Sequence, residues 1–374
     1  MKQGWEIKRL GDICYHESSN ISQNQLENEK GDYPIFGASG LIKNVSFFKQ
    51  DKPYLSIVKD GSGVGRVTKM HSNTSVIGTL QYILPKENID INFLYYSMIS
   101  IDFRKFITGA AIPHIYFKNY KDEPILWVPL NEQKRIVAKL DEIFTNIDKA
   151  KTNAEKNLQN AKELFESCLQ EEVRNSDNSS EYKTLGQISE NFGRGKSKNR
   201  PRNDKKLYGG SYPFIQTGDI RNCNHFITEY TQTYNDVGLA QSKLWPKGTI
   251  CITIAANIAE TGVLTFDSCF PDSIIGLVVN KKIADTNYIE YLLQSFKVKL
   301  QSLGKGSAQA NINMETFKYE LFPIPILKKQ QSIVKKLDVL LAETKKLEAI
   351  YKQKISDLEE LKKSVLQKAF NGEL

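Results

Sequence analysis

The chain has 374 residues and a formal net charge of +8, with 51 lysines and arginines against 43 aspartates and glutamates. This length accommodates two or three domains, and the moderate positive charge favours a polyanionic partner but excludes little by itself. Five cysteines without a C-x-x-C pair argue against a disulfide scaffold or a zinc site, and the lack of a signal-peptide pattern or of any run near ~18 apolar residues predicts a soluble, cytoplasmic protein.

Sequence landmarks recur in the same order in the two halves of the chain. The longest is PLNEQKRIVAKLD at residues 129–141, which returns as PILKKQQSIVKKLD at residues 325–338. Four shorter pairs accompany it: LGDI at 10–13 with LGQI at 185–188, YPIF at 33–36 with YPFI at 212–215, SVIG at 75–78 with SIIG at 273–276, and GAA at 109–111 with GSA at 306–308. Such a repeat predicts two copies of one structural unit, each a globule followed by a helix.

Residues 1–128 are predicted to form the first globule. Short β-rich segments at 54–58, 64–68 and 80–84 are separated by glycines, which favour turns. A helical pattern at 92–100 follows the last of these segments. The mixture predicts an α+β domain.

A long polar helix is predicted for residues 129–173, because apolar residues step by four and three along one face. The positions expected to pack in this stripe include Ile136, Leu140, Ile143, Ile147 and Leu158. A helix of about 40 residues is about 60 Å long at 1.5 Å per residue, which suits a spacer. The polar residues 174–181 are expected to form a linker after it.

The second half repeats this plan. Residues 182–324 are predicted to form a second α+β globule, with strands at 249–255, 262–266 and 274–279 and a helix at 287–295. Residues 325–374 are predicted to form a second long helix. Its expected packing positions include Ile333, Leu337, Leu340, Leu347, Ile355 and Leu358.

Both long helices contain two consecutive steps of four, Ala150–Ala154–Leu158 and Leu347–Tyr351–Ile355, which together form a stutter in a coiled-coil repeat. A shared stutter predicts that the helices pack against each other in a fixed register as an antiparallel coiled coil. The globules would then lie at opposite ends, related by a pseudo-two-fold axis. The predicted fold class is α+β, with two similar domains joined by two long helices.

The sequence lacks convincing motifs for catalysis or metal binding. The segment GRGKS at 193–197 ends like a phosphate-binding loop, but Glu190 occupies the position of the first glycine of that motif. The four histidines have no ligand spacing, and no Asn/Asp-Pro-Pro-Tyr/Phe segment of an amino-methyltransferase is present. The sequence therefore predicts a non-catalytic chain without a metal site.

Basic and amide side chains near predicted turns are candidates for contact with DNA. Arginine and lysine pair with phosphates, arginine reads guanine, and asparagine and glutamine read adenine. In the second half the candidates are Arg194, Lys196, Lys198, Arg200, Arg202, Gln216, Thr217 and Asn257. In the first half they are Lys43, Lys59, Ser62, Arg66, Gln81 and His114. The alternative for the basic run of the second half is a solvated loop without a ligand.

Several of these segments together resemble the DNA-specificity (S) subunit of type I restriction–modification systems. The two related helix openings and the ending LQKAFNGEL at 366–374 carry the resemblance. The segments WEIKRLGDI at 5–13 and YKTLGQI at 182–188 are similar to the usual openings of its two target-recognition domains, and residues 33–85 and 195–264 look like two different subtypes of that domain. The resemblance covers nearly the whole chain.

The resemblance implies that each recognition domain reads one half of a bipartite DNA target, while the helices fix the spacer and dock two methyltransferase subunits. ATP-driven restriction subunits would join for cleavage. S-adenosylmethionine, ATP and Mg²⁺ would be bound by these partners and not by this chain. We expect the target to be asymmetric, because the two globules have diverged and KKQQ at 328–331 replaces NEQKR at 131–135.

Two other functions remain open on the sequence alone. A self-sufficient DNA methyltransferase or nuclease would show activity as the purified chain. A coiled-coil scaffold for proteins would leave no footprint on DNA, although it would not explain two β-rich globules with glycine- and arginine-rich loops.

Overall fold

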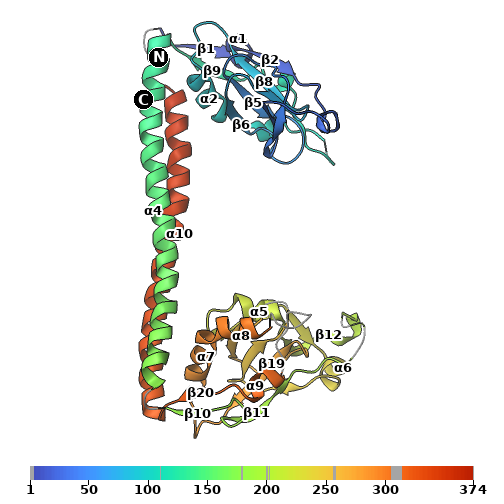
Figure 1. The fold of residues 1–374 in the computed structure, drawn as a ribbon, viewed down its shortest axis with the longest axis vertical. Helices are drawn as coiled ribbons and strands as arrows, with labels where there is room; N and C mark the ends of the chain where they lie inside the picture. The colour runs from blue at the N-terminus through green and yellow to red at the C-terminus, as the bar shows by residue number, and fades with distance from the viewer. Residues whose placement is uncertain are drawn as a thin grey trace. The chain divides into compact units, whose positions relative to one another are not determined.

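The computed structural model describes residues 4–109, 111–177, 180–198, 201, 203–255, 258–304 and 314–373. The chain divides into two compact units, Met1–Lys156 with Lys352–Leu374 and Asn157–Tyr351. Each unit contains one globule and a stretch of each long helix, α4 (Leu130–Asp177) and α10 (Leu327–Phe370) (Figure 1). The sequence landmark at 306–308 lies outside the described residues.

A four-stranded and a three-stranded sheet make up most of the first globule. Their strand orders are β2-β8-β5-β6 and β4-β3-β7, and β1 pairs antiparallel with β9 where the globule joins α4. The strands are β1 (Glu6–Arg9), β2 (Cys14–Ser18), β3 (Tyr33–Gly37), β4 (Gly40–Val45), β5 (Tyr54–Val58), β6 (Val67–Met70), β7 (Ser75–Val76), β8 (Leu80–Pro85) and β9 (Pro124–Trp127). The helices are α1 (Leu10–Ile13), η1 (Gln23–Leu26), α2 (Ile91–Ile99), η2 (Phe103–Phe106) and α3 (Phe117–Tyr120).

The central strand β5 contributes to both apolar cores of this globule. Leu55 and Ile57 pack with residues of α2 and α3 on one face of the four-stranded sheet. Tyr54 and Val58 point to the other face and pack against the three-stranded sheet. Alternate residues of a strand point to opposite faces, so the buried run YLSIV is explained by cover on both sides.

The second globule repeats this topology with different residues. The order β11-β19-β16-β17 corresponds to β2-β8-β5-β6, and β12 pairs in parallel with β18 as β3 does with β7. The strands are β10 (Glu181–Lys183), β11 (Ser189–Arg194), β12 (Tyr208–Phe214), β13 (Phe226–Ile227), β14 (Gln232–Tyr234), β15 (Leu244–Trp245), β16 (Ile250–Thr253), β17 (Thr261–Leu264), β18 (Ser268–Cys269), β19 (Ile274–Val279) and β20 (Phe322–Ile324). The helices are η3 (Lys205–Leu207), α5 (Thr217–Asn222), α6 (Asp236–Ala240), α7 (Thr286–Ser295), α8 (Lys297–Gly304) and α9 (Met314–Lys318). The prediction of two similar α+β domains is confirmed.

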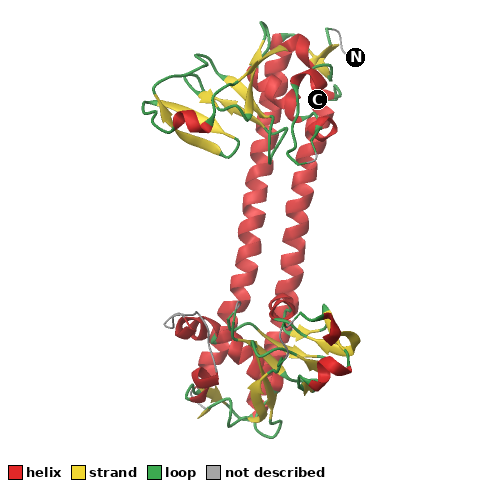
Figure 2. Ribbon diagram, turned by 90° about the vertical axis from the view of Figure 1, so that its right-hand side faces the viewer, coloured by secondary structure: helices red, strands yellow, loops and turns green. Residues whose placement is uncertain are grey.

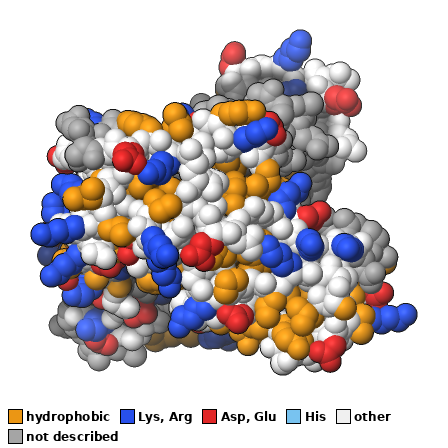
Figure 3. Space-filling view, turned by 90° about the horizontal axis from the view of Figure 1, so that it is seen from below, with side chains coloured by type: hydrophobic (Ala, Val, Ile, Leu, Met, Phe, Trp, Pro, Cys, Tyr) orange, Lys and Arg blue, Asp and Glu red, His pale blue; other side chains and the backbone are white. Residues whose placement is uncertain are grey.

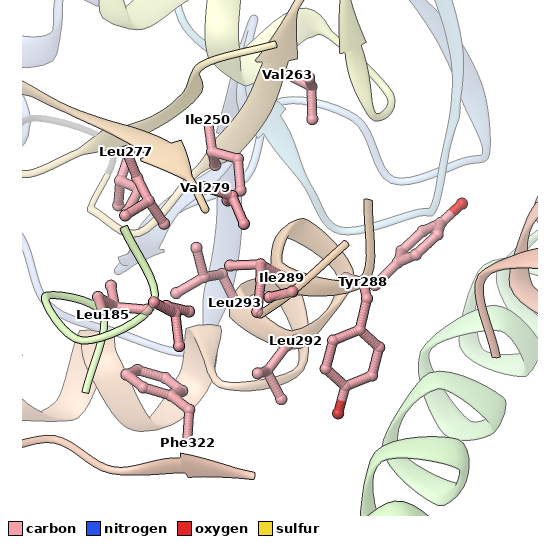
Figure 4. Close-up of a cluster of buried hydrophobic side chains, with 14 of the residues drawn as sticks. Leu185, Ile250, Val263, Leu277, Val279, Tyr288, Ile289, Leu292, Leu293 and Phe322 are labelled. Atoms are coloured by element: carbon pink, nitrogen blue, oxygen red, sulfur yellow. The ribbon is translucent and has the colours of Figure 1, made fainter. Parts of the chain in front are cut away.

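The core of the second globule lies between its five-stranded sheet and α7 (Figure 4). Ile250, Leu277 and Val279 of the sheet face Ile289 and Leu293 of the helix. The helix begins at an aspartate N-cap, Asp285, whose side chain accepts hydrogen bonds from two backbone amides of the first turn. Asp90 caps α2 of the first globule in the same way.

The long helices pack against each other in antiparallel directions within each unit (Figure 2). In the first unit Asp148 pairs with Lys362 and Lys151 pairs with Glu359, so residue numbers rise on one helix as they fall on the other. In the second unit Glu172 pairs with Lys336 at 3.1 Å. The predicted antiparallel coiled coil is confirmed.

Most of the expected packing positions are at least partly buried between the helices, but Leu347 is not. Its side chain is 38% exposed, while Thr344 and Glu348 are buried at 1% and 6% exposure. The Thr344 hydroxyl donates to the carbonyl of Leu340 at 2.9 Å, and the Lys345 ammonium lies 2.9 Å from the Glu348 carboxylate. Thr344 belongs to the predicted stripe, whereas Glu348, whose carboxylate is paired with Lys345, occupies the interior position that the pattern had assigned to Leu347.

The predicted stutter is therefore wrong for α10. Between Leu337 and Leu358, buried or partly buried residues recur in regular steps of four and three, at positions 337, 341, 344, 348, 351, 355 and 358, and Leu340 and Lys345 beside this row are also partly buried. This is an uninterrupted heptad pattern. Taking Leu347 in place of Glu348 shifted one position by a single residue and so created two consecutive steps of four.

Two other predicted boundaries also change. The helix α4 runs to Asp177, four residues into the predicted linker, because Val173 and Ser176 are buried and Ser176 lies 3.4 Å from the Tyr288 hydroxyl. The strand predicted at 64–68 starts at Val67. The preceding Gly65 ends the glycine-rich turn with a φ of +86°. Residues with a side chain rarely adopt this conformation.

Candidate nucleic-acid interface

Each globule contains a cavity at the carboxyl end of the repeated Tyr-Pro strand. In the first globule a cavity of about 230 Å³ begins at Phe36 and Gly37, the end of β3. In the second a cavity of about 650 Å³ is lined by Phe214 at the end of β12 and by Gln216 just beyond it. Both cavities therefore adjoin the end of the same strand of the repeated topology, although the rest of their linings comes from different elements: β5 and β6 in the first globule, β14 and the segment before β12 in the second.

The first cavity has an arginine at its mouth and a serine at its floor. The guanidinium of Arg66 is exposed and donates a hydrogen bond to the carbonyl of Ala38, in the turn between β3 and β4. The hydroxyl of Ser56, on β5, is buried at 1% exposure and has no hydrogen-bond partner among the described residues. An unpartnered buried hydroxyl costs free energy unless a ligand or water satisfies it. The arrangement therefore favours a ligand with polar groups.

Four sequence candidates gather around one pair of loops beside this cavity. The amide of Gly61 donates to the carbonyl of Pro113 at 2.9 Å, and the amide of Ile115 donates to the carbonyl of Lys59 at 2.9 Å. These bonds tie the glycine-rich turn to the loop before α3. The candidates placed there are Lys59, Ser62, Arg66 and His114.

These candidates differ in whether their polar groups are already paired within the fold. The ammonium of Lys59 lies 3.7 Å from Asp60, and Nδ1 of His114 lies 3.1 Å from the carbonyl of Ile112. Ser62 is exposed. The cluster can therefore present a hydroxyl and the fork of Arg66 to a polyanion, while Lys59 and His114 mainly shape the loops.

Two sequence candidates of the first globule have structural roles instead. Gln81 is 5% exposed in the middle of the four-stranded sheet, and it accepts a hydrogen bond from the Tyr120 hydroxyl. The ammonium of Lys43 donates to the carbonyl of Leu26 at 2.7 Å and holds the end of η1. The strand alternation turns Gln81 into the core, which argues against the expectation that it reads DNA. Lys43 is partly buried and engaged with the backbone.

The second cavity is lined by amides, hydroxyls and a lysine. Gln216 forms the N-cap of α5, and its backbone amide donates to Asp219 at 2.8 Å, so Gln216 and Thr217 stand at a rigid turn. The other polar lining residues are Ser197, Asn203, Lys205, Tyr208, Gln232 and Ser273. Asparagine and glutamine amides offer the paired donor and acceptor that match an adenine edge.

The sequence did not single out Asn203 or Gln232 as site residues. Gln232 reaches the cavity because β14 pairs with β12, which places it opposite Phe214. This pairing joins segments with no shared motif, so no local pattern marks the residue. Only the register of the sheet identifies it.

The basic run of the second globule is partly described. The guanidinium of Arg194 donates to the carbonyl of Asp272 at 2.7 Å, and the side chains of Lys196 and Lys198 are exposed. The backbone of this segment is held by Gln241 and Ser242. The candidates Arg200, Arg202 and Asn257 lie outside the described residues.

A further lysine extends this positive charge. The ammonium of Lys243 lies 3.5 Å from the centre of the Trp245 ring and 3.1 Å from the Asn191 side chain. Burial lowers the pKa of Lys243, and the nearby positive charge of Lys196 lowers it further.

Charge alone does not mark the interface. Figure 3 shows lysine and arginine side chains spread over the face seen from below, interspersed with hydrophobic and acidic ones. Among the described residues no group of three or more histidines, cysteines, aspartates or glutamates could hold a metal ion. Within the same residues no helix is long and apolar enough to cross a membrane.

One of the four histidines is buried and paired with a carboxylate. His225 is 2% exposed, and its Nδ1 lies 2.5 Å from the carboxylate of Glu290 on α7. That carboxylate also accepts from Thr261 and Gln294 at 2.7 Å each. Burial alone would lower the pKa of His225, but the hydrogen bond and charge of Glu290 raise it above its ordinary value. The pair ties the start of β13, and through Thr261 β17, to α7, so we assign it a structural role.

Comparison with known proteins adds independent information about both globules. The family model for the type I restriction modification DNA specificity domain matches residues 2–159 and again residues 178–357. A putative type I restriction enzyme specificity subunit from Haemophilus influenzae is 24% identical over 86% of this chain and 85% of its own length. The EcoDI specificity subunit from Escherichia coli is 21% identical over 99% of this chain and 88% of its own length.

Solved structures show the same fold over the whole chain. A chain from a study of complex assembly and conformational transition of the type I R-M system has a TM-score of 0.79 at 17% identity, covering 100% of this chain and 99% of its own. The HsdS subunit from Thermoanaerobacter tengcongensis has a TM-score of 0.59 at 17% identity, covering 100% of this chain and 98% of its own.

Proposed function

This chain belongs to the type I restriction–modification DNA specificity family, and on that premise we propose that it is a non-catalytic DNA-reading subunit in which each globule reads one half of an asymmetric bipartite target. The observation that carries the proposal is that each globule has a cavity at the end of its repeated Tyr-Pro strand, β3 or β12. Their shared position suits a shared task, and their different lining suits different bases.

The lining of each cavity matches a different kind of base recognition. In the first, Arg66 supplies the fork that pairs with guanine or with a phosphate. In the second, Gln216, Asn203 and Gln232 supply amides that suit adenine, with Lys205 available for a phosphate. An asymmetric target follows, because the two half-sites would meet different donor and acceptor patterns.

The long helices suit the role of a spacer between the two readers. Two weak binding modules that are joined covalently bind together far more tightly than either alone, provided that the distance between their sites fits. Half-sites about one helical turn apart, about 34 Å, face the same side of a duplex. We propose that α4 and α10 set this distance and that their exposed faces dock the partner subunits.

The partners supply the chemistry in this proposal. Two methyltransferase subunits would bind S-adenosylmethionine, and restriction subunits would bind ATP and Mg²⁺. The role of this chain is to place them on the chosen sequence in the cytoplasm. Its own residues bind and orient DNA.

Spacer insertion tests the proposal directly. A complex of this chain with its methyltransferase subunits should bind and methylate one bipartite sequence, identified by sequencing the methylated bases of cells that carry the complex. Two base pairs inserted into the spacer should abolish specific binding, because the second half-site is then rotated by about 70° and shifted by about 7 Å at about 10 base pairs and 34 Å per turn. Equal binding to both duplexes, or methylation by the purified chain alone, would contradict the proposal.

A further inference from the structure

The repeated helix motif contains a buried glutamine that joins three segments of the first unit. The side chain of Gln133 is fully buried. Its Oε1 accepts from the backbone amide of Asp90 at 2.8 Å, and its Nε2 donates to the carbonyls of Asn88 at 3.0 Å and Val128 at 2.8 Å. Both N–H groups of the amide are therefore used. The loop before α2, the residue after β9 and the first turn of α4 meet at this one side chain.

The second unit contains the same arrangement. Gln330 is also fully buried, and its Oε1 accepts from the amide of Asp285 at 2.7 Å. Its Nε2 donates to the carbonyls of Ile283 at 3.2 Å and Pro325 at 2.7 Å. The residues that supply the carbonyls differ between the units, but the backbone groups are equivalent. The same set of hydrogen bonds therefore recurs in both halves.

A second bond joins the same two elements further along each long helix. The hydroxyl of Tyr96 on α2 donates to Asp141 on α4. The hydroxyl of Tyr291 on α7 donates to Asp338 on α10 at 2.8 Å. Each aspartate follows its glutamine by eight residues, which is about 12 Å along a helix at 1.5 Å per residue. Two attachment points at this separation resist rotation of the globule about its helix.

Directional bonds are needed for this task because the apolar contacts at the same junction are not directional. Phe93 of α2 packs with Ile136 and Leu140 of α4, and this burial favours association at many relative angles. A buried amide, in contrast, is costly in every arrangement that leaves one of its groups unpaired. The glutamine therefore selects one orientation from those that the apolar surface allows.

We propose that Gln133 and Gln330 are positioning residues that fix the orientation of each recognition domain about its long helix, and that they thereby set which spacer length the chain accepts. The proposal rests on the proposed function, since it assumes that both globules read DNA at once. The glutamines touch no DNA. They act through the angle at which each cavity is presented to its half-site.

The test uses the variants Gln133→Met and Gln330→Met, each in the full chain with its methyltransferase subunits. Methionine is close to glutamine in length and shape but leaves the three backbone groups unpaired. Affinity is measured on duplexes with the native spacer and with one base pair removed or added. We expect the preference for the native spacer to fall about tenfold, which corresponds to ~1.4 kcal/mol, while the bases preferred within each half-site stay the same.

Matched controls separate positioning from a general loss of stability. Gln331→Met changes the exposed residue next to Gln330, and Gln159→Met changes an exposed residue of α4. Both controls should keep the native spacer preference. If a Gln→Met variant does not fold, Tyr291→Phe removes only one hydroxyl from the second attachment point and should reduce the preference by a smaller factor, about threefold, consistent with ~0.7 kcal/mol.

The outcomes distinguish this inference from the proposed function. Folded variants that bind every spacer more weakly by the same factor would show a purely structural role and overturn the inference alone, and so would variants with unchanged preference. A wild-type complex that binds all spacer lengths equally would overturn the proposed function, and the inference with it.

Discussion

At the scale of single residues, buried polar groups distinguish structural from functional side chains in this protein. Gln81 and Lys43 looked like DNA contacts in the sequence, but their polar atoms are occupied within the fold. Ser56 shows the opposite case, because its buried hydroxyl lacks a partner among the described residues and faces the same cavity as Arg66. Whether the polar atoms of a side chain already have hydrogen-bond partners within the fold therefore indicates the interface better than the type of residue does.

Arg66→Ala should weaken DNA binding and relax the base preference in one half-site only, by roughly 1–3 kcal/mol. Arg66 stands at the mouth of the first cavity, and the second cavity does not depend on it. The measurement is binding to duplexes substituted one base at a time in each half-site, at several salt concentrations. Arg9→Ala is the control, since Arg9 pairs with Asp122 on the same globule. A uniform loss over both half-sites would argue that Arg66 contacts only phosphate.

Gln216→Ala should relax the base preference of the other half-site, and the loss should be largest where adenine is preferred. Gln216 lies at the second cavity on a capped turn, so shortening its side chain removes the amide. Gln159→Ala, on the exposed face of α4, should leave the preference unchanged. A shift in the half-site that Arg66 affects would contradict the division of labour between the globules.

The stability contributed by His225 should decrease as the pH rises. Burial opposes the charged form, but the hydrogen bond and charge of Glu290 raise the folded-state pKa above the ordinary value of 6.5. A raised folded pKa gives stability that is complete below pH 6.5 and is lost as the pH rises through the folded value. Urea unfolding of the wild type and of His225→Gln across this range measures it. His71→Gln, at an exposed site, is the control, and a constant difference between wild type and His225→Gln would contradict the expectation.

At the scale of elements, the coiled coil is a regular heptad whose interior accepts satisfied polar residues. Thr344 and Glu348 occupy buried positions in α10, while the apolar Leu347 is more than one-third exposed. The apolar pattern therefore identified the helix and its general face but misplaced one position within the face. A threonine can be buried when its hydroxyl donates to a carbonyl of its own helix. The polarity of a side chain therefore does not by itself tell which of two neighbouring helical positions is buried.

Leu337→Ala should destabilise the second unit by roughly 2–5 kcal/mol, whereas Leu347→Ala should cost less than about 1 kcal/mol. Leu337 is buried between α4, α7 and α10, but Leu347 leaves no cavity when it is shortened. Urea unfolding of the two variants provides the comparison. Equal losses of unfolding free energy in the two variants would indicate that Leu347 is buried inside the coiled coil.

At the scale of the whole molecule, the chain is one fold used twice, and the lining of the two cavities differs between the copies. The sheets keep the same strand order, and the globules keep the same attachment to their helices. What changes is the lining beyond β3 and β12. This separation allows recognition to vary while the attachment stays constant.

Replacing residues 181–324 with the matching segment of another family member should change one half-site and leave the other half-site and the spacer unaltered. These ends coincide with β10 and β20, which pair with each other, so the exchange removes a closed segment. Sequencing the methylated bases in cells that carry the hybrid complex reports both half-sites and the spacer together. A change in both half-sites would contradict modular recognition.

The sequence by itself determined the repeat, the two α+β domains and the long helices, because these depend on local order and periodicity. An apolar stripe along a helix, or a strand bounded by glycines, is specified by residues that lie close together in the sequence. The tertiary structure alone decided which candidates share a cavity and which are buried. Gln232 reaches its site through the register of β14 with β12, and Gln133 and Gln330 bond the amides of Asp90 and Asp285, more than 40 residues away along the chain. Such contacts depend on packing between distant segments, which no local pattern records.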